Sequence, residues 1–350
     1  MRVRKALVQA GLLAALPYTL AGAQAPAAQP TPPSVSVGGV LYAQFQYALR
    51  SDSLGDHANN FDLTRVYFTG TARLAKGVGA RMTLESFRPT SSSGIEVRVK
   101  YGFAQLTPEG SALSFKVGQI QTPWVDYDEG MWDYRSQGSI AMDRAGYLSS
   151  ADLGLSVDGS WNRDMVTMSA GVYDGETYRV APGDHHKDAA ARLTVRLAPS
   201  DDAGRFGGLR LTGFGLYGEP NRGGTRQRWL GQLSYRSNRL MLAGAYAATR
   251  DRVDSTATAT TLKGSVASIY GWVRFGPAPL AILARVDLVD PNTAIDRNGQ
   301  TRYIGGVSYR VSPNLRLIAD IDHLSYRAGA PNAALDAARS QALFQVDLVF

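Results

Sequence analysis

The chain has 350 residues, a formal net charge of +7 and no cysteine. A chain without cysteine has neither disulfides nor thiolate metal sites, and a modest basic excess without a Lys/Arg run argues against nucleic acid as a partner. Mean hydropathy is −0.17 and no stretch after residue 25 approaches the roughly 18 apolar residues of a transmembrane helix, which leaves a soluble protein or a membrane β-barrel.

The first 25 residues are typical of a secretory signal peptide. Residues 2–5 carry three basic side chains, residues 6–21 are apolar and uncharged, and Ala-Gln-Ala at 23–25 is a small-x-small cleavage pattern. Cleavage would leave about +4 of the formal charge. The Pro- and Ala-rich residues 26–34 are predicted to form a short periplasmic tail.

Residues 35–350 predict an all-β fold, because about sixteen segments are long enough for tilted membrane strands and none has a helical period. In 279–290, for example, apolar residues alternate with Arg285 and Asp287. Short connections alternate with long ones along the whole chain, as in an up-and-down membrane barrel and unlike a Greek-key sandwich. The predicted strands are 35–50, 61–74, 78–88, 94–107, 112–120, 152–160, 165–174, 188–198, 208–218, 227–237, 239–250, 264–275, 279–290, 300–311, 314–326 and 340–350.

Residues 120–151 form an unusually long connection, which predicts a functional loop or disorder. Apolar anchors such as Trp124 and Trp132 argue against disorder. We therefore expect a constriction loop that folds into the lumen, with acidic residues facing a basic wall: Asp126, Asp128, Glu129 and Asp133.

Alternation also predicts which charged side chains line the lumen. So many inward charges indicate a water-filled interior, because a buried unpaired charge is costly, although we expect part of the set to pair across neighbouring strands. The basic set is Arg65, Arg81, Arg98, Lys100, Lys116, Arg192, Arg196, Arg210, Arg236, Arg285, Arg302, Arg310 and Arg316. The acidic set is Glu85, Glu96, Asp287, Asp320, Asp322 and Asp347.

Aromatic residues near strand ends are candidates for the interfacial girdles of a membrane barrel: Trp229, Tyr235, Tyr270, Trp272, Tyr303 and Tyr309. The histidines form no catalytic arrangement; His185 and His186 point apart, and His323 faces away from Asp320 and Asp322. We therefore expect no catalytic residue, no metal site and no cofactor.

The last strand ends in Phe350, with Phe344, Val346 and Leu348 on the same face and Gln345 and Asp347 on the other. A terminal aromatic residue resembles the signal that outer-membrane barrels present to the barrel-assembly machinery. Because a signal peptide stands at the other end of the chain, we expect Phe350 to act as that assembly signal.

Residues 116–123, Lys-Val-Gly-Gln-Ile-Gln-Thr-Pro, and residues 61–70, Phe-Asp-Leu-Thr-Arg-Val-Tyr-Phe-Thr-Gly, resemble segments of the phosphate-selective porin O and P family of Gram-negative outer membranes. In that family the first segment precedes the constriction loop, and the second carries a lumenal Arg. The resemblance implies a sixteen-stranded, trimeric porin in the cell outer membrane.

These features together predict a channel for passive diffusion of small hydrophilic solutes, with a mild preference for anions, phosphate among them. The expected partners are outer-membrane lipid, the assembly machinery, the solutes and two further copies of the chain. An adhesin or structural barrel with a plugged lumen is the alternative, and it would block ions. A barrel phospholipase or protease is less favoured, because it needs Ser/His or Asp/His groups that converge on one rim.

Overall fold

The computed structural model describes residues 33–350 except 51–55, 89–93, 182, 184, 220–223, 253–259, 277 and 328–339. The predicted signal peptide and residues 26–32 of the predicted tail lie outside the described residues. The first strand begins at Ser34, one residue before the predicted start of the barrel.

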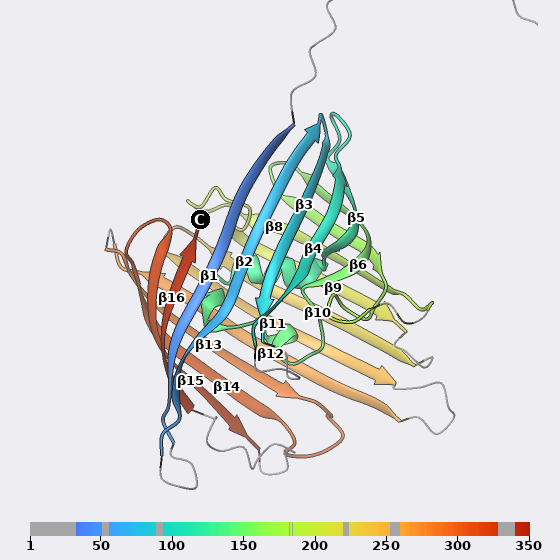
Figure 1. Ribbon diagram of the computed structural model, residues 1–350. Helices are drawn as coiled ribbons and strands as arrows, with labels where there is room; N and C mark the ends of the chain where they lie inside the picture. Colours follow the sequence, from blue (N-terminus) through green and yellow to red (C-terminus); the bar gives the residue numbers. More distant parts are fainter. Residues whose placement is uncertain are drawn as a thin grey trace, which may run out of the picture.

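Sixteen antiparallel strands make up the described part of the chain (Figure 1). Each alternates outward and inward side chains, which suits a wall with lipid on one side and a polar interior on the other. The strands are β1 (Ser34–Ala48), β2 (Asn59–Ala75), β3 (Val78–Phe87), β4 (Glu96–Leu106), β5 (Leu113–Gln121), β6 (Ala151–Trp161), β7 (Val166–Tyr173), β8 (Asp188–Ala198), β9 (Gly208–Gly218), β10 (Thr225–Arg236), β11 (Leu240–Arg252), β12 (Thr261–Arg274), β13 (Leu280–Asp290), β14 (Gln300–Arg310), β15 (Leu315–Tyr326) and β16 (Ser340–Val349).

The sheet closes into a barrel, because each strand pairs with its neighbours in sequence and β16 pairs with β1. The seam runs from the pair Val40 and Val349 to the pair Ala48 and Gln341. Beyond it, the backbone N–H of Gly39 donates to the carbonyl of Phe350 at 2.7 Å, and the N–H of Phe350 donates back at 3.0 Å. The predicted sixteen-stranded up-and-down barrel is confirmed.

The two rims of the barrel differ in the length of their connections. The connections from each even-numbered strand to the next odd-numbered strand, such as 76–77 and 237–239, are mostly tight turns. We call the end of the barrel where they lie the short-turn rim. Connections such as 122–150 and 174–187 lie at the opposite end, the long-loop rim. In membrane barrels the short turns are periplasmic and the longer loops extracellular.

The outward face is apolar and the inward face is polar. In β16 the outward Phe344 is 49% exposed, whereas the inward Gln345 is 1% exposed. Trp229, Tyr235, Tyr303 and Tyr309 point outward and are exposed, in keeping with a girdle position. The girdle prediction is wrong for Tyr270 and Trp272, which point inward and are buried because the loop after β5 covers them.

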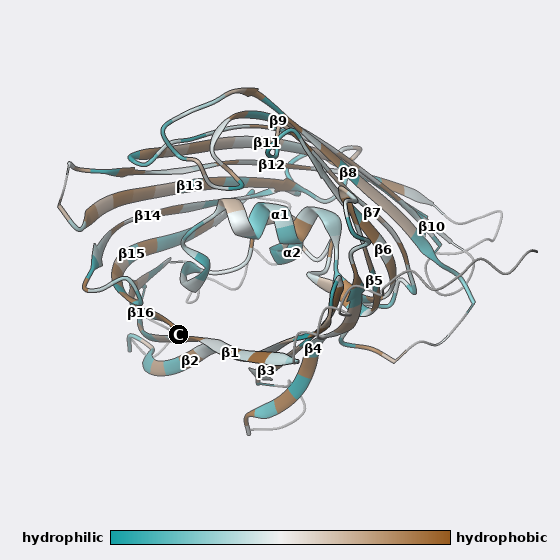
Figure 2. Cartoon of the chain, turned by 90° about the horizontal axis from the view of Figure 1, so that it is seen from above, coloured by the Kyte–Doolittle hydropathy of each residue, from teal (hydrophilic) through white to brown (hydrophobic). Residues whose placement is uncertain are grey.

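The connection between β5 and β6 lies inside the barrel, against the wall that contains β12 and β13 (Figure 2). This constriction loop, residues 122–150, contains α1 (Pro123–Met131), a 3-10 turn η1 (Arg135–Gln137) and α2 (Ala141–Arg144). It starts two residues later and ends one residue earlier than the predicted 120–151. None of the helices in the described ranges is long and apolar enough to cross a membrane.

Candidate functional site

The constriction loop owes its position to its aromatic residues. Pro123 at the first turn starts α1 with a fixed backbone angle, and Trp124 and Tyr127 are then buried against the wall. Trp132 is fully buried, with ring centres 5.4 Å from Tyr270 of β12 and 5.5 Å from Tyr134. Burial of an aromatic side chain contributes about 2 kcal/mol or more, so the loop is held to this side of the barrel.

Arginines of the wall donate hydrogen bonds to loop carbonyls. Arg192 of β8 donates from Nε to the carbonyl of Pro123 at 3.1 Å, and Arg285 of β13 donates from Nη1 to the carbonyl of Ser139 at 2.9 Å. These bonds satisfy backbone acceptors that the loop would otherwise bury unpaired. Arg192 and Arg285 are only 3% and 2% exposed, so they anchor the loop from beneath it.

Arg210 of β9 is also covered. It is fully buried and donates to the carbonyls of Gly207 at 3.0 Å and Asp164 at 2.9 Å, both in turns of the short-turn rim. Arg196 donates to the carbonyl of Arg163 in the same region. Alternation along the sequence predicts that all of the inward basic residues line the pore. The structure corrects this for Arg192, Arg210 and Arg285, which lie on the inner face but under the loop or the turns.

The acidic residues of the loop mostly have partners on the side where the loop docks. Asp128 is 4% exposed and accepts hydrogen bonds from the Tyr270 hydroxyl and from Nε2 of Gln232 at 2.7 Å. Burial raises the pKa of the Asp128 carboxyl above its usual range. Asp133 pairs with both terminal nitrogens of Arg236, at 3.1 and 3.2 Å.

The other two carboxylates have cationic partners within the loop or in a turn of the short-turn rim. Glu129 lies 2.6 Å from a nitrogen of Arg135 in the same loop, and Asp126 lies 3.5 Å from Arg205 in the turn after β8. The expectation that all four carboxylates face a basic wall across the lumen is wrong for Asp128, because the helix turns this residue toward β10 and β12.

The wall formed by β1–β3 lies across the barrel from the docked loop (Figure 2). Arg65 of β2 lies 5.2 Å from the ring centre of Tyr67 and 5.7 Å from that of Tyr42. Arg81 of β3 lies 4.9 Å from the ring centre of Tyr101 and donates from Nε to a threonine hydroxyl at 3.2 Å. Within the described residues neither guanidinium has a carboxylate at ion-pair distance. Stacking fixes both cations while leaving their N–H edges available.

Glu85 offsets one of two neighbouring positive charges on this side of the barrel. Its carboxylate lies 2.8 Å from Arg98 and 3.6 Å from Lys100, and it accepts from the hydroxyl of Tyr178 at 2.9 Å. Lys100 is 2% exposed, whereas the side chain of Arg98 is 24% exposed. The wall therefore keeps the charges of Arg65 and Arg81 and one of the two charges of Arg98 and Lys100.

Most of the remaining predicted charges are paired along the inner face. Arg302 contacts Asp322 at 2.7 Å, and Lys116 contacts Asp158 at 2.9 Å. The pairs Arg316 with Asp347 and Arg285 with Asp287 are also formed. Asp320 is buried and has no hydrogen-bond partner among the described residues. Glu96 is exposed at the start of β4, and Arg310 is exposed at the short-turn rim.

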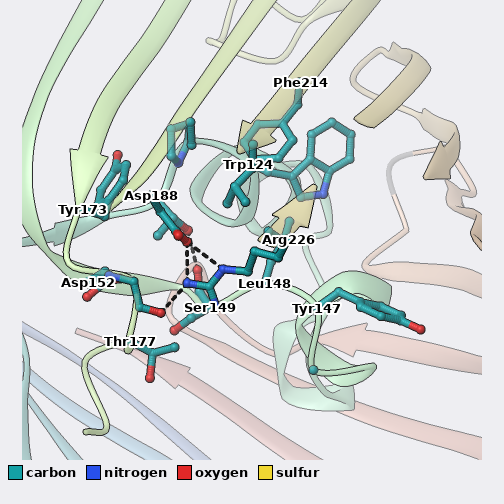
Figure 3. Close-up of a pocket in the computed structure, with 16 residues that line it drawn as sticks. Trp124, Tyr147, Leu148, Ser149, Asp152, Tyr173, Thr177, Asp188, Phe214 and Arg226 are labelled. Carbon is teal, nitrogen blue, oxygen red and sulfur yellow. Dashed lines mark hydrogen bonds and ion pairs between the residues drawn. The ribbon is translucent and has the colours of Figure 1, made fainter. Parts of the chain in front are cut away.

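Sequence reasoning missed several inward charges. Arg226 and Arg228 of β10 face inward. Arg226 lies before the predicted strand start at 227, and Arg228 is absent from the predicted set although it shares a face with Arg236, which is included. Arg226 bonds Asp188 across a cavity of about 90 Å³ that the loop and β6–β10 enclose (Figure 3). Arg274 was missed because it shares a face with Trp272, which had been assigned to the girdle. Consistent alternation through β12 would have found it.

The loop cation Arg144 was also outside the predicted set. It belongs to α2 and lies 4.0 Å from Asp322. Burial, with the neighbouring cations Arg285 and Arg302, lowers the pKa of its guanidinium to about 9. Its charge is therefore costly in this position, and Asp322 offsets part of that cost.

The histidines have structural partners. Nδ1 of His186 lies 2.8 Å from Glu219, and His323 faces outward, stacked 6.2 Å from Tyr303. In the part of the chain that the structure describes, no group of three or more His, Asp or Glu residues is arranged to hold a metal ion.

A closed sixteen-stranded barrel with an inward loop and a charged inner face defines a channel-type outer-membrane protein. Residues 12–329 match the model of the Gram-negative porin family. The chain belongs to that family, and both family and fold indicate a channel rather than an enzyme.

Solved porin structures share the fold at low sequence identity. The anion-selective porin from Comamonas acidovorans has a TM-score of 0.67 at 16% identity, covering 91% of this chain and 99% of that one. The trimer form of OmpT from Vibrio cholerae has 0.65 at 13% identity, covering 91% and 100%. OmpF of Salmonella typhi has 0.65 at 14% identity, covering 90% and 97%. Among curated proteins, no relative matches the chain.

Proposed function

We propose that the barrel is a water-filled channel through which small hydrophilic solutes diffuse passively across the outer membrane, with a mild preference for anions. Inward side chains that remain partly exposed support a wet lumen: those of Arg98 and Arg302 are 24% and 25% exposed, and that of Lys116 is 19% exposed. A barrel of about sixteen strands is also too wide for its own side chains to fill.

One observation carries the anion preference. On the wall across from the loop, Arg65 and Arg81 have no carboxylate at ion-pair distance among the described residues, and Glu85 offsets only one of the two charges of Arg98 and Lys100. An unpaired cation beside a water-filled path attracts anions and repels cations. The structural neighbour from Comamonas acidovorans is itself described as anion-selective. Phosphate would belong to the permeant class as one small anion among others.

The expected partners follow from the outer surface and the chain ends. The apolar outward faces suit outer-membrane lipid and two further copies of the chain, and a neighbour of the same fold is recorded in a trimer form. Phe350, at the seam beside Gly39, would be the terminal signal for the assembly machinery. Export would require the predicted signal peptide at residues 1–25.

Single-channel recording in a planar bilayer tests this function. Purified protein in KCl should give discrete conductance steps, and a salt gradient should give a reversal potential of the sign that anion preference requires. Absence of steps from folded protein would refute the channel. A reversal potential of the opposite sign would refute the assignment of Arg65 and Arg81 as the controlling charges.

A further inference from the structure

The short-turn rim contains a second cluster of cations, away from the wall of Arg65 and Arg81. A cavity of about 360 Å³ lies between Asp133 of the constriction loop and the ends of β10, β12 and β14–β16. Four arginines line it: Arg236, Arg274, Arg310 and Arg316. Since the cavity borders the predicted periplasmic mouth, its role rests on the proposed channel function.

Two of these arginines are satisfied by the protein's own carboxylates. Arg236 binds Asp133 through both terminal nitrogens and Asp202 through Nε at 3.0 Å. Arg316 contacts Asp347 and donates to the carbonyl of Asp133. The cluster therefore already shows guanidinium groups holding carboxylates at this location.

The other two arginines have spare capacity. Arg274 lies 3.7 Å from Asp133 and donates from Nη1 to the carbonyl of Asn238 at 3.3 Å. Its guanidinium lies 4.2 Å from the ring centre of Trp272, a stack that fixes the plane and leaves N–H edges free. Among the described residues, Arg310 has no side-chain hydrogen bond or ion pair.

Arg274 and Arg310 stand on either side of β13, at the same rim. Arg274 is opposite Ala281 in the register of β12 and β13, and Ser308, two residues before Arg310, is opposite Ala281 in the register of β13 and β14. Ala281 is an inward residue with a small side chain, 4% exposed. The long side chains of Arg274 and Arg310 can therefore reach toward one ligand that lies over Ala281.

The lining also has an apolar part. Pro313, Leu315 and Val349 border the same cavity as the arginines. An inorganic oxyanion gains nothing from these side chains, whereas a short carbon chain loses water-exposed apolar area on contact with them. A guanidinium in turn binds a carboxylate through two parallel N–H donors.

We propose that this cavity is a binding subsite for small organic carboxylates, held by Arg274 and Arg310 with the carbon chain on Pro313 and Val349. The subsite would concentrate organic acids at the short-turn mouth of the channel. It differs from the wall of Arg65 and Arg81 in place and in lining, because the cations of that wall lie over tyrosine rings, whereas this cavity is bordered by aliphatic side chains.

The test uses succinate as the probe and inorganic phosphate for comparison. We measure the succinate concentration that halves the chloride current of the full-length protein in planar bilayers, and succinate binding to detergent-solubilised protein by calorimetry. The double variant Arg274→Ala/Arg310→Ala should weaken both by about tenfold or more, since it removes charge-assisted hydrogen bonds. Arg310→Lys, which keeps the charge but loses the fork of donors, should weaken binding by a smaller factor.

Arg239→Ala is the matched control, because Arg239 is an exposed arginine in the turn of the same rim and does not line the cavity. It should leave succinate binding unchanged. Equal affinity for phosphate and succinate would overturn the organic-carboxylate assignment. The assignment of the subsite to Arg274 and Arg310 would be overturned if the double variant bound succinate as tightly as the wild type, or if only Arg65→Gln weakened binding. Failure of the channel function would be seen separately, because folded protein would then show no conductance in KCl. Calorimetry would still measure succinate binding at the subsite.

Discussion

Reversal of the charge at Arg65 should convert much of the anion preference into cation preference. The substitution Arg65→Glu replaces a cation that has no ion-pair partner among the described residues, on the wall of β1–β3, with a carboxylate. For an ion passing ~5 Å from the charged group, Coulomb's law in water gives about 0.8 kcal/mol per unit charge. Charge reversal changes this by about 1.7 kcal/mol for each ion, with opposite signs for anion and cation, or about 3.3 kcal/mol between them.

Salt reduces this difference. At 0.15 M the Debye length is about 8 Å, which leaves roughly 1.8 kcal/mol over a 5 Å separation. Because about 1.4 kcal/mol corresponds to a factor of ten, the anion-to-cation permeability ratio should fall roughly 20-fold. Arg65→Gln, which only removes the charge, should lower the ratio by about the square root of that factor, roughly 4-fold.

The assay is the reversal potential in a KCl gradient, measured on protein whose folding is checked by heat-modifiable mobility on a gel. Lys76→Glu is the matched control, since its side chain is 78% exposed in the turn between β2 and β3 and the substitution makes the same charge change. If Arg65→Glu and Lys76→Glu gave the same reversal potential, the reasoning that unpaired wall cations set selectivity would be refuted.

Three further predictions concern the loop, the seam of the barrel and the two cations beside Glu85. Asp128→Asn keeps a hydrogen-bond acceptor for Tyr270 but cannot ionise. Because the pKa of Asp128 is raised in the folded protein, the unfolding temperature of the wild type should fall as the pH rises from 4 to 8, and that of the variant should fall less. Gly39→Val places a side chain where the ring of Phe350 packs, so the yield of folded, heat-modifiable barrel should drop. Glu85→Gln removes the counter-charge of two cations and should raise the anion-to-cation permeability ratio by roughly 4-fold.

Each of these has an outcome that contradicts it. Equal pH slopes for wild type and Asp128→Asn would show that folding does not raise the pKa of this carboxyl. Gly70→Val is the control for the seam, because a Cβ at Gly70 meets no atom within 4 Å, and equal loss of folding in both variants would remove the role of the Phe350 ring. A lower or unchanged ratio in Glu85→Gln would mean that Arg98 and Lys100 do not act on the permeating ions.

Local alternation explains why the strands could be predicted. The predicted segments 188–198 and 208–218 coincide with β8 and β9, since a period of two is readable from any short stretch. Boundaries were weaker wherever the pattern was short: β10 begins at Thr225, two residues before its predicted start, and Arg226 was lost for that reason. Tyr270 and Trp272 were misplaced because aromatic residues suit both a lipid interface and a buried loop.

The sequence by itself determined the barrel, the parity of its turns and most of the charged side chains that point inward, because each depends on neighbours within a few residues. The tertiary structure decided which inward charges meet water. Asp128 finds Tyr270 across 142 positions, and Tyr134 finds Ser308 across 174. These contacts bury Arg192 and Arg285 under the loop and leave Arg65, Arg81 and Arg310 without carboxylate partners in the described residues. No local pattern encodes that division, since it depends on where a loop docks within the closed barrel.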